Sequence, residues 1–341
     1  RLDVIDQIAK EPDLKITNNG PRLHEFIREL SKETFQKGDL ITVGEAWGAD
    51  TERAKLYSNP DGSEFSMVFQ FEHMMLDQEE GKEKWDVCPL SLVKLKKNLA
   101  KWQNELYNCG WNSLFWDNHD LPRIVSRWGN DKEYRAESAK MLATILHGMQ
   151  GTPYVYQGEE LGMTNVRFED ISQYQDIEIR NMYRERLAKG YKEADIMESI
   201  YAKGRDNART PMQWSAGKNA GFTEGTPWLG VNPNYTEINA EEELKNPDSV
   251  FHYYKKLIAL RKEYEILTEG GFRLLLEEDE NVFVYEREYK GKKLLVAGNF
   301  TEKEVPCPLL KEWEGAETLI HNYKEEEGKV LRPYEAFIKI K

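Results

Sequence analysis

Short apolar runs that alternate with amphipathic segments are the feature that most constrains how this chain can fold. Apolar runs at 40–45, 65–71 and 112–116 are typical of buried strands, and apolar residues recur at helical spacing in 21–36 and 91–108. Strands that alternate with helices along a chain form a parallel sheet. The pattern therefore predicts an α/β fold in which the carboxyl ends of the strands share one edge.

The alternation extends to both sides of these segments. Residues 1–5 resemble the end of a buried strand, a helix is predicted near 134–149, and residues 153–157 form a further apolar run. Residues 161–249 differ from the rest, because they are polar and carry Asn-Pro turn signals.

A second change of pattern follows a helix that we predict from about 249 to 264. Short strands such as 283–285 and 293–297 come after it, and no long helix is expected among them. We therefore predict two domains: an α/β domain over residues 1–268 and a small antiparallel β domain over residues 271–341.

Composition excludes several classes of protein. The net charge is −13, from 47 Lys and Arg against 60 Asp and Glu, which argues against a nucleic-acid partner. No apolar run approaches the roughly 20 residues that span a bilayer, so a membrane partner is not expected. The three cysteines lie far apart, which excludes a disulfide scaffold and a zinc knuckle and favours a reducing compartment such as the cytoplasm.

Three acidic residues stand at the ends of predicted strands. They are Asp3 in R-L-D-V-I, Glu45 in I-T-V-G-E-A-W and Asp120 in F-W-D-N-H-D. A strand and helix together take about 30 residues in an eight-stranded α/β barrel, so Asp3 and Glu45 fit neighbouring strands. Asp120 fits a position two strands farther on, with the 65–71 run between. All three carboxylates are therefore expected to meet at the carboxyl face of one barrel.

Carboxylates gathered in this way predict hydrolysis of a sugar bond. A glycosidase needs one ionised carboxylate to attack the anomeric carbon and one protonated carboxyl group to release the leaving oxygen. An ionised carboxylate inside an apolar run is costly unless it is paired, which disfavours a purely structural role for all three. Tryptophans near these acids suit the faces of sugar rings, and we expect this of Trp47, Trp85, Trp111 and Trp116.

The motifs resemble a known family. R-L-D-V-I, V-G-E-A-W and F-W-D-N-H-D are similar to the second, third and fourth signature regions of the α-amylase family, glycoside hydrolase family 13. G-T-P-Y-V-Y-Q-G-E-E-L-G-M-T-N at 151–165 and G-R-D-N-A-R-T-P-M-Q-W at 204–214 resemble the oligo-1,6-glucosidase subgroup. That subgroup includes dextran glucosidase and trehalose-6-phosphate hydrolase. The resemblance covers nearly the whole chain.

The resemblance implies a role for each residue that matches a motif. Asp3 matches the nucleophile, Glu45 the general acid/base, and Asp120 the third acid, which holds sugar hydroxyls. Arg1 matches the arginine whose charge keeps the nucleophile ionised. His119 matches a histidine that binds a glucose hydroxyl, and its alternative is a core histidine.

Four further residues match positions that bind substrate. Arg205 matches an arginine that grips the non-reducing end of the glucose, although Arg–Asp pairs also tie loops together. Val4 matches a position that is usually Val in enzymes preferring α-1,6 links, with a β-branched strand residue as the alternative. Lys84 and Glu178 match contacts to the second sugar, and solvated charges are their alternative.

The function implied is that of a retaining, exo-acting α-glucosidase without a cofactor. Its substrates would be α-1,6-linked gluco-oligosaccharides such as isomaltose, panose and dextran fragments. Trehalose-6-phosphate hydrolase is the alternative within the same class. A non-catalytic family member and a carbohydrate-binding module are the alternatives from other classes.

The sequence also departs from the family pattern. Family members carry three earlier strands, a first signature region and a lid domain, all of which would precede Arg1. We therefore predict an incomplete (β/α)8 TIM barrel, strands 4–8, whose partner is the missing N-terminal part of the same protein. A calcium-binding loop would belong to that part. An incomplete barrel leaves raw sheet edges, so residues 1–341 alone are expected neither to fold stably nor to hydrolyse sugar.

Overall fold

A row of parallel strands forms the centre of the first part of the chain. The computed structural model describes residues 1–324 and 330–341. Strand β1 (Val43–Glu45) pairs in parallel with β2 (Met67–Phe69), and β3 (Ser113–Leu114) pairs in parallel with β4 (Thr152–Pro153). Isolated parallel bridges join Leu2 to β1 and β2 to the residue before β3. Five segments therefore lie side by side in the order of the sequence.

The paired strands are shorter than the apolar runs predicted. In residues 1–5 only Leu2 pairs with a neighbour, and the chain then turns into a 3-10 helix at Ile5–Gln7. The run at 112–116 continues past β3 because the loop that follows is buried too. Trp116 in that loop is fully buried and donates from Nε1 to the carbonyl of Leu142 at 2.8 Å.

Five helices flank these strands, three of them where the apolar spacing predicts them. They are α1 (Leu23–Glu33), α2 (Thr51–Tyr57), α3 (Leu92–Leu106), α4 (Ile124–Trp128) and α5 (Arg135–His147). Two begin at side chains that accept a hydrogen bond from the first helical turn: Asp50 caps α2 and Ser91 caps α3. The helices predicted at 21–36, 91–108 and 134–149 are confirmed.

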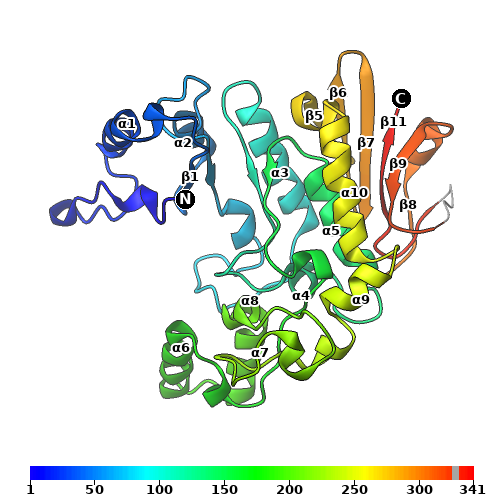
Figure 1. Cartoon of the computed structure of the whole chain (residues 1–341). Coiled ribbons are helices and arrows are strands. Elements are labelled where there is room, and N and C mark those ends of the chain that lie inside the picture. Colours follow the sequence, from blue (N-terminus) through cyan, green and yellow to red (C-terminus); the bar gives the residue numbers. More distant parts are fainter. Residues whose placement is uncertain (325–329) are drawn as a thin grey trace.

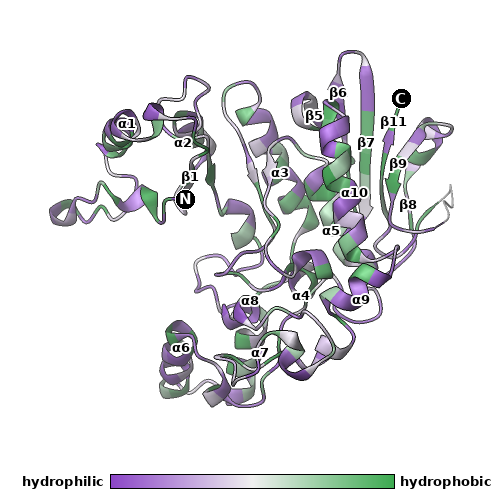
Figure 2. Cartoon of the chain, in the orientation of Figure 1, coloured by the Kyte–Doolittle hydropathy of each residue, from purple (hydrophilic) through white to green (hydrophobic). Residues whose placement is uncertain are grey.

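The polar segment after β4 contains more regular structure than its turn signals indicated. It forms α6 (Ile177–Ala188), α7 (Glu193–Lys203), α8 (Asp206–Arg209) and α9 (Ala240–Lys245), which Figure 1 shows at the lower edge of the molecule. Hydrophilic residues dominate α6 (Figure 2). A small apolar set, which includes Ile179, Ile196 and Ile200, is nevertheless buried. This set holds the helices together although most of their surface is polar.

The last part of the chain is an antiparallel sheet. Helices α10 (Val250–Glu263) and α11 (Ile266–Glu269) lead into strands in the order β5-β6-β7-β11-β9. Their bounds are β5 (Gly271–Leu275), β6 (Val282–Tyr289), β7 (Lys292–Asn299), β9 (Glu317–His321) and β11 (Ala336–Ile340). Strand β8 (Val305–Pro306) pairs separately with β10 (Val330–Leu331). The antiparallel strands predicted here are confirmed.

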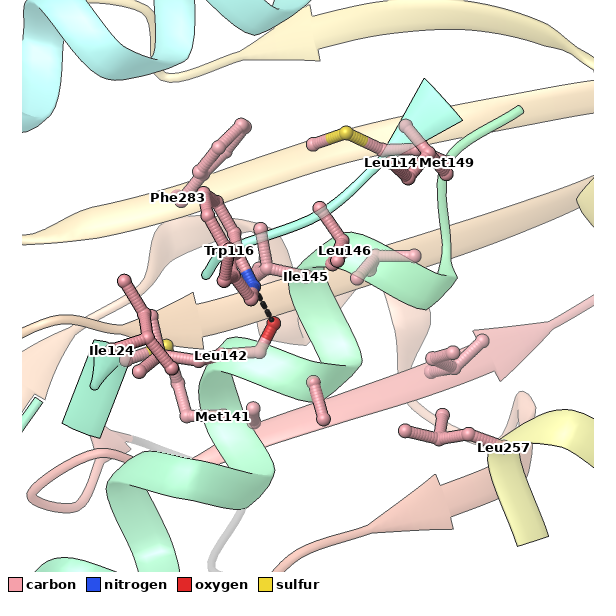
Figure 3. Close-up of a cluster of buried hydrophobic side chains, with 14 of the residues drawn as sticks. Leu114, Trp116, Ile124, Met141, Leu142, Ile145, Leu146, Met149, Leu257 and Phe283 are labelled. Atoms are coloured by element: carbon pink, nitrogen blue, oxygen red, sulfur yellow. Dashed lines mark hydrogen bonds between the residues drawn. The ribbon is translucent and has the colours of Figure 1, made fainter. Parts of the chain in front are cut away.

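One hydrophobic core joins the antiparallel sheet to the rest of the chain. Helix α5 contributes Leu142, Ile145 and Leu146, which lie beside Trp116 and Phe283 (Figure 3). The hydroxyl group of Tyr285 on β6 also donates to the carbonyl of Ile145 at 2.7 Å. Lys96 on α3 donates to two carbonyls of the loop between β5 and β6 and to that of Val282, the first residue of β6.

Burial of Trp116 predicts a large loss of stability on truncation. Its exposed fraction is 0%, so Trp116→Ala should lower the free energy of unfolding of the full-length protein by about 3–5 kcal/mol. Trp228 is 66% exposed, so Trp228→Ala should change the free energy of unfolding by less than about 0.5 kcal/mol. Denaturant titration of the two variants measures the difference. Equal effects would contradict the placement of Trp116 in the core.

Over residues 1–324 and 330–341, no helix combines the length and the apolar character that crossing a bilayer demands.

Candidate active site

Two of the predicted acids stand at the carboxyl edge of neighbouring strands. The amide of Leu2 donates to the carbonyl of Val43 at 2.9 Å, and the amide of Glu45 donates to the carbonyl of Leu2 at 2.8 Å. Glu45 is the last residue of β1, and Asp3 follows Leu2 directly. The neighbouring positions predicted from their spacing are confirmed.

One guanidinium group joins these two acids. Arg1 donates from Nη1 to Oδ1 of Asp3 at 2.9 Å, and its Nη2 contacts Oε2 of Glu45. The two carboxyl groups differ in their access to water: the side chain of Asp3 is 71% exposed and that of Glu45 is 4% exposed. An exposed acid and a buried acid therefore meet at one cation.

This arrangement shifts the two pKa values in opposite directions. The hydrogen bond from Arg1 lowers the pKa of Asp3. Burial raises the pKa of Glu45, and the negative charge of Asp3 adds to this, although the bonds from Trp47 and Arg1 oppose it. Asp3 is therefore easier to ionise than an ordinary aspartate and Glu45 is harder to ionise than an ordinary glutamate, which is the direction of difference that a retaining glycosidase requires.

Trp47 contacts the carboxyl group of Glu45 directly. Its Nε1 donates to Oε1 of Glu45 at 2.8 Å. The indole ring stacks on Phe71 with ring centroids 3.7 Å apart and an interplanar angle of 7°. One face of this tryptophan is therefore covered by protein, and its polar edge points at the candidate acid.

The expectation that three other tryptophans face sugar rings is wrong. Trp85 and Trp116 are buried in hydrophobic clusters, which the apolar periodicity around them favours. Trp111 donates from Nε1 to Oγ1 of Thr152 at 2.8 Å, at the residue where β4 begins. It therefore lies at the amino ends of the strands, opposite the acids.

The third acid lies on a loop beyond β3 rather than at the end of the strand itself. His119 Nε2 and Asp120 Oδ2 are 3.2 Å apart. Arg209 donates to Oδ1 of Asp120 at 2.6 Å and to the carbonyl of His119 at 2.8 Å. The alternative of a core histidine is wrong, because the His119 side chain is 47% exposed.

Arg205 links Asp120 to the start of α6. Its Nη1 lies 3.3 Å from Oδ1 of Asp120, and its Nε and Nη2 donate to the two oxygens of Asp176 at 2.7 and 2.6 Å. Burial would raise the pKa of Asp176, but the bonds from Arg205 outweigh it and lower that pKa. Arg205 therefore ties two loops together at the same place where it was predicted to bind substrate.

The two residues predicted to contact a second sugar pair with each other. Lys84 Nζ lies 2.5 Å from Oε2 of Glu178, and that oxygen is 3.2 Å from Nε of Arg205. Burial lowers the pKa of Lys84. The structure brings both residues to the Arg205 cluster, and their contact with a sugar stays a prediction.

Val4 does not belong to a strand. Its φ of 40° and ψ of 44° are left-handed, which is rare for a β-branched residue, and it precedes the 3-10 helix at Ile5–Gln7. The alternative of a β-branched strand residue is therefore wrong. Its predicted influence on linkage preference is untested.

Sequence reasoning missed Arg209 and Asp176. Arg209 stands four residues after Arg205 in G-R-D-N-A-R, and this helical spacing could have indicated that both arginines serve one carboxylate. Asp176 caps α6, two residues before Glu178. An Asp directly before a helical run is a capping signal, but it does not reveal a partner 29 residues away.

A pocket of about 220 Å³ opens beside these residues. Its polar lining includes Arg1, Asp117, Asn118 and His119, whereas Phe69, Phe115 and Val155 supply apolar walls; the pocket reaches the acids through Arg1 and His119, which contact them. Within the described residues, no three His, Cys, Asp or Glu side chains gather as metal ligands. The calcium loop predicted for a preceding segment stays a prediction.

Comparison with known proteins places this site in a family. The family model "Alpha amylase, catalytic domain" matches residues 1–270. The chain belongs to the alpha-amylase family. It is 52% identical to an oligo-1,6-glucosidase of Bacillus cereus over 359 aligned positions. The alignment covers 99% of this chain and 64% of the relative.

Two other members of the alpha-amylase family are similarly close. A glucan 1,6-alpha-glucosidase of Streptococcus pneumoniae is 53% identical, covering 99% of this chain and 63% of its own. The crystal structure of Bacillus licheniformis trehalose-6-phosphate hydrolase superposes with a TM-score of 0.93, and its sequence is 47% identical. The superposition covers 100% of this chain and 64% of that one. The chain thus spans about 64% of the length of the relatives it matches.

Proposed function

We propose that the full-length protein is a retaining, exo-acting α-glucosidase that releases glucose from the non-reducing end of α-1,6-linked gluco-oligosaccharides. The observation that carries this proposal is the pair Asp3 and Glu45, held by the guanidinium group of Arg1, with pKa values shifted in opposite directions. Family membership supports the reaction class.

The reaction would proceed in two steps. The carboxylate of Asp3 attacks the anomeric carbon while Glu45 gives its proton to the glycosidic oxygen, so that the leaving sugar departs and a glucosyl ester forms. Glu45, now ionised, then takes a proton from water, and the resulting hydroxyl attacks the same carbon. The ester breaks, Asp3 is regenerated, and glucose leaves with its α configuration retained.

The arginine cluster supports exo action. Arg205 and Arg209 converge on Asp120, and His119 beside it acts on the charge of Asp3, so this cluster is linked to the Asp3–Glu45 pair through His119. Such groups suit the hydroxyls of a terminal glucose. An arginine bonded to two loops at once would close the pocket behind that sugar.

Relatives and local charge favour α-1,6-linked glucosides over a phosphorylated substrate. Two of the relatives described above are named for 1,6-linked glucosides. Four cations of the candidate site already have carboxylate partners, namely Arg1, Lys84, Arg205 and Arg209. A phosphate dianion needs uncommitted cations.

Trehalose-6-phosphate hydrolase remains the second candidate, because a solved structure of that name matches with a TM-score of 0.93. A panel of isomaltose, panose, maltose, trehalose-6-phosphate and sucrose, tested on the full-length protein, separates the two. We expect isomaltose and panose to give the highest kcat/KM. A preference for trehalose-6-phosphate would overturn the α-1,6 assignment, and initial β-glucose seen by NMR would overturn retention.

The pKa directions predict a bell-shaped dependence of kcat/KM on pH. Asp3 must be ionised, and its pKa is lowered, so the acid limb should lie below the ordinary aspartate value of about 3.9. Glu45 must be protonated, and its pKa is raised, so activity should fall only above the ordinary glutamate value of about 4.3. Initial rates on isomaltose across pH measure both limbs, and an acid limb above pH 5 would contradict the assignment.

We further infer that the five parallel segments are strands 4–8 of a (β/α)8 barrel. The row of Leu2, β1, β2, β3 and β4 in chain order supports this, as does the 64% coverage of the relatives. Residues 1–268 would then be barrel and residues 271–341 the β domain. An incomplete barrel leaves its first and last strands unpaired, so residues 1–341 expressed alone should be unstable and inactive.

A further inference from the structure

The two oxygens of the Glu45 carboxyl group have different surroundings. Oε2 contacts Arg1, and the same guanidinium group holds Asp3 through Nη1, so Oε2 faces the nucleophile. Oε1 accepts the indole N–H of Trp47 at 2.8 Å. The orientation of the carboxyl group is therefore fixed from both sides.

Trp47 is held in place independently of Glu45. Its ring stacks on the buried Phe71, and the next residue, Gly48, is gripped through both of its peptide groups. The amide of Gly48 donates to Oδ2 of Asp6 at 2.9 Å, and its carbonyl accepts from Nδ2 of Asn19 at 2.8 Å. A Cβ at position 48 would lie 2.4 Å from Asn19 Nδ2, so a side chain there would displace the amide group that holds this segment.

The indole nitrogen can only donate a hydrogen bond. The Arg1 guanidinium also carries donors only, so both oxygens of Glu45 accept hydrogen bonds and neither partner can take its proton. Trp47 supplies the uncharged donor of the two, at Oε1. Once Glu45 has given its proton to a leaving group, this N–H stabilises the carboxylate.

We propose that Trp47 is a positioning residue for Glu45: its indole N–H fixes the orientation of the carboxyl group at Oε1 and stabilises the carboxylate that activates water in the second step. The inference rests on the proposed function, because it assigns that function's acid/base a partner. Trp47 acts through Glu45 and takes no part in bond making itself.

The charges around Glu45 fix the direction of the expected effect. Arg1 and Asp3 face its carboxyl group, and His119 acts on Asp3. Burial raises the pKa of Glu45, the Asp3 charge adds to this, and the Trp47 and Arg1 bonds lower it. Removing only the indole N–H should therefore raise the pKa of Glu45 further.

Trp47→Phe in the full-length protein tests this, because phenylalanine keeps a ring for Phe71 but lacks the N–H. We expect the basic limb of kcat/KM on isomaltose to move up by about one pH unit. With p-nitrophenyl α-glucoside, whose leaving group needs little acid help, kcat should fall severalfold on the acid side, where Glu45 must act as a base.

Trp111→Phe is the matched control. It removes an indole N–H of the same 2.8 Å hydrogen-bond length, but at the opposite end of the strands. We expect both limbs to stay within about 0.2 pH units of the unsubstituted protein. A limb that does not move in Trp47→Phe, or that moves equally in Trp111→Phe, overturns the proposal.

A second measurement does not depend on turnover. The carboxyl bands of the protein, with those of Glu45→Gln subtracted, follow the titration of Glu45 by infrared spectroscopy. The apparent pKa should rise by about one unit in Trp47→Phe at an unchanged melting temperature. If the Glu45 titration does not shift in Trp47→Phe, the hydrogen-bond role of Trp47 is refuted, even if activity is lost. If the unsubstituted protein is inactive, the proposed function is refuted, and the titration still decides whether Trp47 acts on Glu45.

Discussion

Asp3→Asn in the full-length protein should lower kcat on isomaltose by about 10⁴-fold or more, which is the scale of loss when a covalent nucleophile is removed. An amide oxygen is a poor nucleophile and cannot form the glucosyl ester. The Asp3 side chain is largely exposed, so its replacement removes little packing and the melting temperature should stay within a few degrees. Steady-state kinetics and thermal unfolding measure the two quantities.

Asp13→Asn is the matched control, since Asp13 is an exposed aspartate in a short 3-10 helix at Pro12–Leu14. It should leave kcat unchanged. A loss of less than tenfold in Asp3→Asn would remove Asp3 from the role of nucleophile. A loss accompanied by unfolding would instead show a structural role.

Glu45→Gln should have an effect that depends on the leaving group. Glutamine cannot supply a proton, so kcat/KM on isomaltose should fall by roughly 10²- to 10⁴-fold. An aryl glucoside such as p-nitrophenyl α-glucoside leaves without that proton, so its kcat/KM should fall far less. The kcat on the aryl glucoside should still be low, because hydrolysis of the glucosyl ester lacks its general base.

A burst of p-nitrophenol, followed by a slow steady state, would confirm this division of the two steps. Glu133→Gln, an exposed substitution in the segment between α4 and α5, should show neither effect. Equal losses on the two substrates would contradict the acid/base role of Glu45.

The sequence predicted the central elements well because their side chains keep strict apolar periods. Helices at 21–36 and 91–108 each bury one stripe, the helix at 134–149 is buried on all sides over residues 138–147, and β1 and β2 lie within the predicted apolar runs. The polar helices after β4 were missed, since few of their residues are apolar and the buried ones come from several elements at once.

The candidate site was predicted in part. Strand spacing placed Asp3 and Glu45 side by side, because neighbouring parallel strands end at one edge. It could not place Trp111 at the amino or the carboxyl end of its strand, because that depends on the residue at which β3 begins to pair with β4. Contacts such as Arg209 with Asp120 depend on how distant loops fold onto each other, and no local period encodes them.

The shared core described above has a consequence for attempts to redesign substrate choice. Tyr285 on β6 holds the end of α5, and that helix leads directly to β4, whose neighbour Tyr154 lines the pocket. Substitutions in the outer sheet can thus shift a pocket wall without touching any residue proposed to bind the sugar. Mutant libraries for this protein should include β6 alongside the loops around the acids.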